Sequence, residues 1–128
     1  YAACVAWGPH FDYHAVWEKR WAAMKRDGNS VATSHFQLPW VLGTPDMDSA
    51  MKKVKDYTLA GVAEKIECPT LIVHGDRDPL YPVNLAMEMY TAIPRAALWV
   101  VPNGGHGPVF GPMAPRFRET ALEFLRAG

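Results

Sequence analysis

Two residues of this chain combine a reactive side chain with a position just beyond an apolar, strand-like run. Asp78 follows the run at residues 70–74, and His106 follows the run at residues 97–101 through a glycine-rich turn. A helix-like stretch separates the runs, and strand–helix–strand order over about 30 residues predicts a parallel crossover. Functional groups in an open parallel sheet collect beyond the carboxyl ends of the strands, so we expect both side chains at one sheet edge.

An aspartate and a histidine placed in this way could be the acid and the base of a hydrolytic triad. A carboxylate that accepts from Nδ1–H fixes the imidazole in one tautomer and stabilises the imidazolium. Aspartate before histidine is also the order that remains once the serine of a Ser…Asp…His series has passed. Taken alone, Asp78 could instead be a turn carboxylate bound to its own backbone, and His106 a solvated histidine in a glycine loop.

No residue of the chain has the sequence surroundings of a nucleophile. A G-x-S-x-G elbow, which holds a serine on a strand-to-helix turn, does not occur in the sequence. Ser30, Ser34 and Ser49 lack flanking glycines. The residues therefore predict an acid and a base without their nucleophile.

The expected elements form an α/β arrangement. Apolar runs at residues 2–7, 70–74 and 97–101 predict strands that are covered on both faces, as in a parallel sheet. Apolar residues at helical spacing predict helices that begin near residues 13, 44, 83 and 113, and a short helix at 59–66. We expect Thr44 to cap the second helix, Pro45 to occupy its first turn, and residues 30–43 to be irregular. Three strands leave a sheet edge open, which suggests further sequence upstream of Tyr1.

Composition and charge exclude several classes of protein. Of the 128 residues, 49% are hydrophobic, and 13 basic residues balance 13 acidic ones, which favours a folded chain without a nucleic-acid partner. No apolar stretch approaches the roughly 20 residues of a membrane helix, and no charged segment marks a signal peptide. Cys4 and Cys68 lack Cys-x-x-Cys spacing, which favours two buried free thiols in a reducing, cytoplasmic compartment.

The C-terminal half of the sequence is similar to a known family. The resemblance is to the C-terminal half of an α/β-hydrolase, and it rests on Ile66-x-Cys68-Pro69-Thr70-Leu71-Ile72-Val73-His74-Gly75-x-x-Asp78, the following Pro82, and Gly104-Gly105-His106. It implies that Asp78, rather than Asp76, is the acid and that His106 is the base. It also implies a core strand at residues 1–7, a helical cap at 8–68 and a strand–helix–strand–helix end at 69–128. The nucleophile elbow and the oxyanion hole would then lie upstream of Tyr1.

Two narrower resemblances concern shorter segments. The segment Tyr57–Pro69, with Trp40-Val41-x-Gly43 before it, is similar to the dihydroxypseudooxynicotine-hydrolase and FrsA-like esterase group. That group implies hydrolysis of carbon–carbon bonds or esters. The segment Pro102–Phe110 looks more like smaller esterases and lipid-type hydrolases. The two likenesses do not agree on a substrate.

Several other side chains have both a functional and a structural interpretation. Four aromatic residues could line a substrate pocket beneath the cap or could simply pack its helices: Trp17, Trp21, Phe36 and Trp40. His10 and His14 have the spacing of two ligands on one helix face, but no third ligand and no H-E-x-x-H motif accompany them, so we expect no metal site. His74 is expected in the core or at its rim, and Asp76 in a structural turn.

Together these observations predict the C-terminal portion of a serine hydrolase. It would act on a small-molecule ester, or on a related acyl or carbon–carbon bond, with Asp78 and His106 completing a triad whose serine belongs to a missing N-terminal half. We expect no cofactor and no membrane partner, and homo-oligomerisation is left open. The alternative is a non-catalytic fragment or degenerate hydrolase fold that serves as a binding or assembly module. The 128 residues alone are expected to be inactive.

Overall fold

The computed structural model describes residues 1–27, 36–107 and 110–128, which divide into two compact units. The sheet unit comprises Tyr1–Phe11 and Leu59–Gly128, and the helical unit comprises Asp12–Thr58. Residues 8–11 and 59–68 were expected in the cap, but they belong to the sheet unit, where Phe11, Leu59 and Ala63 join one core cluster. The role of the helical unit as a cap remains a prediction.

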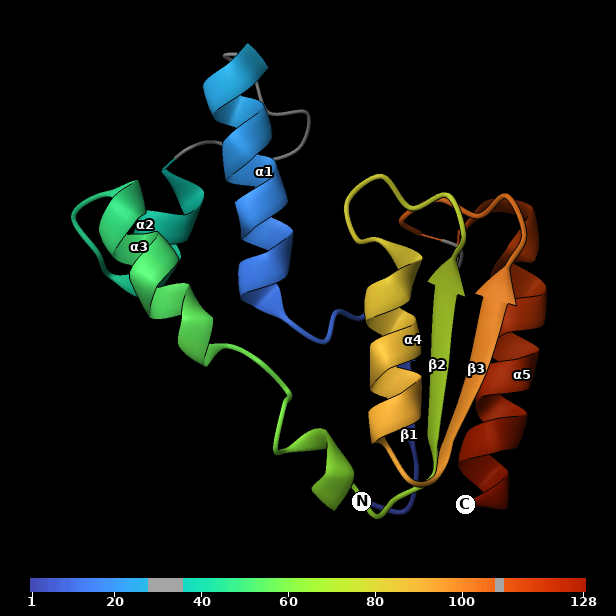
Figure 1. The fold of residues 1–128 in the computed structure, drawn as a ribbon. Helices are drawn as coiled ribbons and strands as arrows, with labels where there is room; N and C mark the ends of the chain where they lie inside the picture. Colours follow the sequence, from blue (N-terminus) through green and yellow to red (C-terminus); the bar gives the residue numbers. More distant parts are fainter. Residues whose placement is uncertain (28–35, 108–109) are drawn as a thin grey trace. The chain divides into compact units, whose positions relative to one another are not determined.

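A three-stranded parallel sheet forms the centre of the sheet unit (Figure 1). Its order is β1 (Cys4–Trp7), β2 (Thr70–Gly75) and β3 (Ala96–Val101), with β2 in the middle. All residues of β2 are buried, as the continuous apolar run predicted. Gly75, the last residue of β2, is paired with Val101, the last residue of β3, so the two strands end side by side.

Helices cover both faces of this sheet, because successive side chains of a strand point to opposite faces. On one face α4 (Val83–Ala92) packs Ala86 and Met89 against Ile72 of β2. On the other face α5 (Ala114–Ala127), which follows a 3₁₀ turn at Gly111–Met113, packs Phe117 and Phe124 against Leu71 and Val73. Figure 1 shows the sheet between these two helices. The expected parallel α/β layers are therefore confirmed.

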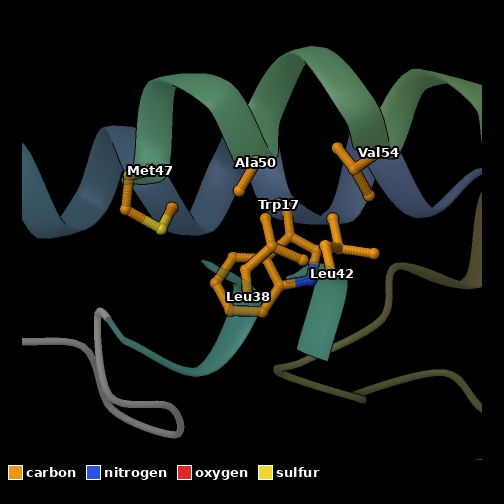
Figure 2. Close-up of a cluster of buried hydrophobic side chains, with 6 residues drawn as sticks. All are labelled: Trp17, Leu38, Leu42, Met47, Ala50 and Val54. Carbon is orange, nitrogen blue, oxygen red and sulfur yellow. The ribbon is translucent and has the colours of Figure 1, made fainter. Parts of the chain in front are cut away.

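The helical unit consists of α1 (Tyr13–Asp27), α2 (Gln37–Leu42) and α3 (Met47–Lys53), followed by a 3₁₀ turn at Val54–Asp56. Figure 2 shows its core, in which Trp17 of α1 meets residues of the later helices: Leu38, Leu42, Met47, Ala50 and Val54. The expectation of irregular structure at residues 30–43 is wrong for residues 37–42, which form α2. Leu38 and Leu42 are four residues apart, so one helical turn brings both into this core.

Two local expectations need correction. Asp46, not Thr44, caps α3: an oxygen of its carboxylate accepts from the Ser49 backbone N–H at 2.7 Å, and Pro45 precedes the helix. This hydrogen bond lowers the pKa of Asp46 below its ordinary value of 3.8. The helix expected at 59–66 is only a 3₁₀ turn at Ala63–Lys65, because Gly61 adopts a left-handed conformation (φ 75°) just before it.

The two cysteines are free, but they are not both buried as expected. Cys4 is exposed and Cys68 is half-buried. Cys4 lies on β1, a strand of mixed exposure at one edge of the described sheet, whereas β2 is enclosed by neighbours on both sides. Within the described residues, no helix has the length and apolar character needed to cross a membrane.

Candidate active site

The turns that follow β2 and β3 interlock at the carboxyl edge of the sheet. The backbone N–H of Arg77 donates to the carbonyl of Gly104 at 2.9 Å, and that of Asp76 donates to the carbonyl of Val101 at 3.2 Å. A Cβ added to Gly75 would lie 2.2 Å from the Gly104 carbonyl oxygen, far closer than atoms can approach. Glycine is therefore required where the turn that carries Asp78 crosses the turn that carries His106.

The side chain of Asp78 is buried, and both of its carboxylate oxygens have partners. Oδ1 accepts hydrogen bonds from the backbone N–H groups of Leu80 (2.7 Å) and Tyr81 (3.0 Å). Oδ2 lies 2.9 Å from Nδ1 of His106, and the aspartate side chain is fully shielded from solvent. The turn thus holds the carboxylate in one orientation, with one oxygen fixed by the backbone and the other directed at the imidazole.

His106 contacts Asp78 through one ring nitrogen while its side chain remains 45% exposed. Because a carboxylate oxygen accepts, Nδ1 carries the hydrogen, and in the neutral ring Nε2 is left as a proton acceptor. Asn103 adopts a left-handed conformation (φ 57°) in the turn that delivers the ring, a conformation that asparagine tolerates well. Gly8, at the end of β1, lies against the ring: an added Cβ would be 3.7 Å from Cε1 of His106. This geometry is compatible with a general base and an orienting acid.

His74 is a second histidine beside the same carboxylate. Its side chain is completely buried, its Nε2 donates to the Tyr81 carbonyl at 2.8 Å, and the same nitrogen lies 3.8 Å from Oδ2 of Asp78. Its Nδ1 has no hydrogen-bond partner among the described residues. The burial of His74 agrees with its expected place in the core, and its bond to Tyr81 secures the turn after Asp78.

Tyr81 and His10 were not singled out by the sequence as parts of this site. The ring of Tyr81 packs against His106 with centroids 4.9 Å apart, and His10 stacks on the Tyr81 ring at 4.9 Å. His10 therefore belongs to the sheet unit, while His14 lies on α1 of the helical unit. A local signal was the position of Tyr81 three residues after Asp78, because aspartate side chains often bind the backbone of the turn that follows them.

The four aromatic candidates occupy three different environments within the helical unit. Trp17 is 1% exposed in its core, which favours the packing interpretation for this residue. Trp21 and Phe36 line a hollow of about 450 Å³, together with Pro39 and the α3 N-terminus. Trp40 is 79% exposed and is not among the residues that line this hollow. Substrate contact remains a prediction for all four.

Other sequence candidates lie away from the acid–base pair or carry no chemistry there. Asp76 is exposed and contributes its backbone N–H to the turn, while its neighbour Asp78 provides the buried carboxylate. Ser34 falls in residues 28–35, outside the described part of the chain, as does Ser30. Ser49 donates its backbone N–H to the cap of α3. The described residues hold no group of three or more His, Cys, Asp or Glu side chains suited to a metal ion.

Curated relatives match a large part of this chain but only part of their own length. The chain is 32% identical over 98 residues to the "Putative carbamate hydrolase RutD" of Klebsiella pneumoniae, covering 77% of this chain and 35% of the relative. The protein of the same name from Escherichia coli is 29% identical over the same length, with the same shares covered. The chain thus spans about a third of the length of these relatives.

Solved structures show the same fold at low sequence identity. A puromycin-hydrolyzing peptidase of Mycobacterium tuberculosis matches with a TM-score of 0.68 at 17% identity, covering 98% of this chain and 18% of the other. An esterase from Exiguobacterium antarcticum matches with a TM-score of 0.59 at 18% identity, covering 98% of this chain and 57% of the other. These likenesses concern the fold alone.

The sequence profile of the TAP-like protein family matches residues 48–128, which include β2, β3 and the turns that carry Asp78 and His106. This match covers more than half of the chain, and the solved structures named above share its parallel sheet. The chain belongs to the TAP-like family of the α/β-hydrolase superfamily.

Proposed function

We propose that this chain supplies the acid and the base of a serine hydrolase. The observation that carries the proposal is the 2.9 Å contact between Nδ1 of His106 and Oδ2 of a fully buried Asp78. A buried carboxylate with every oxygen paired holds its charge in place, so it can orient the ring and stabilise the imidazolium that forms during reaction. Membership of a hydrolase superfamily supports the same assignment.

In the proposed reaction a serine hydroxyl attacks the carbonyl carbon of the substrate. Nε2 of His106 takes the hydroxyl proton as the new bond to carbon forms, and then gives that proton to the leaving group as the acyl–enzyme appears. Water, deprotonated by the same nitrogen, releases the acid and restores the serine. Asp78 keeps the ring in the tautomer in which Nε2 accepts, and no metal or organic cofactor takes part.

The serine and the oxyanion hole belong, in this proposal, to another part of the intact protein. Two observations support a missing segment: the chain covers 35% of the length of its curated relatives, and β1 is an outer strand of the described sheet. A further parallel strand could pair with β1 and bring a nucleophile elbow to the same carboxyl edge.

The substrate class follows from the reaction and not from a fitted pocket. A Ser–His–Asp triad cleaves the bond between a carbonyl carbon and its leaving group. Esters and related acyl compounds are therefore the proposed substrates. The name of the relatives, carbamate hydrolase, adds carbamates to this class because a carbamate also presents a carbonyl carbon to the nucleophile. Carbon–carbon bonds next to a carbonyl are retained as a further candidate.

The test uses the intact protein encoded around this chain. A fluorophosphonate probe should label one serine upstream of Tyr1, and peptide mass spectrometry should locate it in a G-x-S-x-G elbow. His106→Ala should slow the labelling strongly, while His14→Ala, which alters a histidine of the helical unit, should leave it unchanged. An intact protein without Ser, Cys or Asp at the elbow position, and without labelling, would favour a binding or assembly module instead.

The isolated chain provides a second test of the same proposal. These 128 residues should not turn over a nitrophenyl ester, because an imidazole and a carboxylate without a nucleophile lack the covalent step. Turnover by the isolated chain that disappears in His106→Ala would contradict the proposed location of the nucleophile.

A further inference from the structure

Tyr81 contacts both members of the acid–base pair, and the second histidine beside them, through three separate parts of its structure. Its backbone N–H donates to Oδ1 of Asp78 at 3.0 Å, and its carbonyl accepts from Nε2 of His74 at 2.8 Å. Its ring lies 4.9 Å from the ring of His106, centroid to centroid, with an angle of 50° between the planes. Tyr81 therefore contacts the acid through its backbone and the base through its ring.

A single hydrogen bond from Nδ1 does not fix the orientation of the His106 ring. Small rotations about the two side-chain bonds of His106 can still tilt the ring, and nearly half of the side chain is exposed. Such a rotation would turn Nε2 away from the position where a nucleophile must lie. Reacting groups need a near-attack geometry, and a misplacement of about 1 Å can reduce turnover by about a hundredfold.

We infer that Tyr81 is a positioning residue whose ring holds the imidazole of His106 in the orientation required for proton transfer. This inference rests on the proposed function, because it assigns a task to Tyr81 in that reaction. Aromatic rings with centroids 4.5 to 7 Å apart attract one another in tilted and offset arrangements, which is the range observed here.

His10 supports the Tyr81 ring from the segment after β1. The two rings are nearly parallel, with 17° between their planes and centroids 4.9 Å apart. Tyr81 is therefore the middle ring of a series that runs from His10 to His106. Since the backbone of Tyr81 is already fixed by Asp78 and His74, the stacked His10 restrains the remaining freedom of its side chain.

The test compares three variants in the intact protein: Tyr81→Leu, Tyr81→Phe and His10→Leu. The first readout is the downfield proton resonance of His106 Nδ1–H, which is measured without substrate and is identified by its loss in Asp78→Asn. The second readout is a pair of kinetic constants, kcat and KM, which are measured separately to show which of them changes. We expect Tyr81→Leu to broaden the resonance and to lower kcat about tenfold with little change in KM. Tyr81→Phe should restore both, and His10→Leu should give a smaller loss in the same direction.

Three results would overturn the inference. The first is a Tyr81→Leu variant with the resonance and kcat of the parent protein. The second is an equal loss in Tyr81→Phe, which would assign the effect to the hydroxyl group instead of the ring. The third applies if circular dichroism shows that Tyr81→Leu is unfolded: His10→Leu then decides, and an unchanged resonance and kcat count against the inference. Failure of the proposed function has a different signature, namely normal turnover in Asp78→Asn.

Discussion

The two units of the molecule bury different kinds of side chain. The core cluster of the helical unit consists of apolar residues around Trp17, whereas the sheet unit also buries the carboxylate of Asp78 and the imidazole of His74. His74 lies near the end of β2 and Asp78 in the turn that follows it, where the turn backbone supplies hydrogen-bond partners. Most buried polar groups are hydrogen-bonded, and a buried carboxylate beside an imidazole can act on protons, so we expect the chemistry in the sheet unit.

Asp78→Asn should have the largest effect of the substitutions considered, because it removes the carboxylate on which turnover depends in the sheet unit. The asparagine oxygen would have to face the N–H groups of Leu80 and Tyr81, which leaves its NH₂ group opposite Nδ1 of His106. The imidazole would then carry its hydrogen on Nε2 and could not accept a proton. We expect kcat of the intact enzyme to fall by about 10⁴, as in known triads.

Asp76→Asn is the matched control for this prediction. Asp76 is an exposed residue of the same turn and participates through its backbone N–H. The turnover of the Asp76→Asn variant should stay close to that of the parent protein. Near-normal turnover in Asp78→Asn, or an equal loss in both variants, would remove Asp78 from its assigned role.

Trp17→Ala tests whether the helical unit depends on its own apolar core. Truncation of a large buried aromatic side chain costs about 3–5 kcal/mol, and Trp17 is 1% exposed in that core. Hydrogen exchange should accelerate across α1 and α3 and remain slow in β2. Trp40→Ala is the control, since its side chain is 79% exposed and should change stability by less than about 0.5 kcal/mol. Uniform loss of protection in both units would argue against independent cores.

Phe36→Ala tests whether the helical unit takes part in substrate selection. Phe36 lines the hollow of about 450 Å³ beside Trp21, and its side chain is 60% exposed. We expect the preference for long over short acyl chains, measured as the ratio of kcat/KM values, to fall by about tenfold. Val41→Ala, which alters an exposed residue of α2 that does not line the hollow, should keep the preference of the parent protein. An unchanged ratio in Phe36→Ala would leave the hollow without a role in selectivity.

Asp46→Asn should have the smallest effect, and that effect should disappear at low pH. The hydrogen bond from Ser49 lowers the pKa of Asp46 in the folded chain, so the ionised form stabilises α3 above pH 3.8. That contribution is lost as the pH falls through the lowered pKa, because the carboxylate then becomes protonated. The asparagine variant should lack this loss, so its melting temperature and that of the parent should converge between about pH 6 and about pH 2.5. A constant difference over this range would contradict the assignment.

Most of the sheet unit could be predicted from the sequence, because the patterns that indicate its strands and turns lie within short segments. Apolar runs, glycine turns and the order of strands and helices located β2, β3 and the turns of Asp78 and His106. The contact between Tyr81 and His10 could not be predicted in this way, since the two rings come from segments far apart in the chain. Nothing in either segment indicates which distant ring it will meet.

The helical unit was harder to predict because aromatic residues on short helices have several possible environments. Spacing placed Trp17 on one face of α1, but it did not show that this face would be enclosed by α2 and α3. The same ambiguity affected residues 37–42, where the proline and the aromatic residues suggested irregular structure. Pro39 lies in the first turn of α2, where a proline does not interrupt helical hydrogen bonds.

The close approach of Gly75 to the Gly104 carbonyl has a consequence for engineering this scaffold. The backbones of the two turns are in direct contact at this point, so a replacement of one turn would clash with the other unless both are exchanged together. A graft that moves the histidine loop into a related enzyme, or that lengthens it before Gly105, has to carry the segment from Gly75 to Tyr81 along with it. Recombination points for chimeric hydrolases therefore lie outside these paired turns, within α4 or after the start of α5.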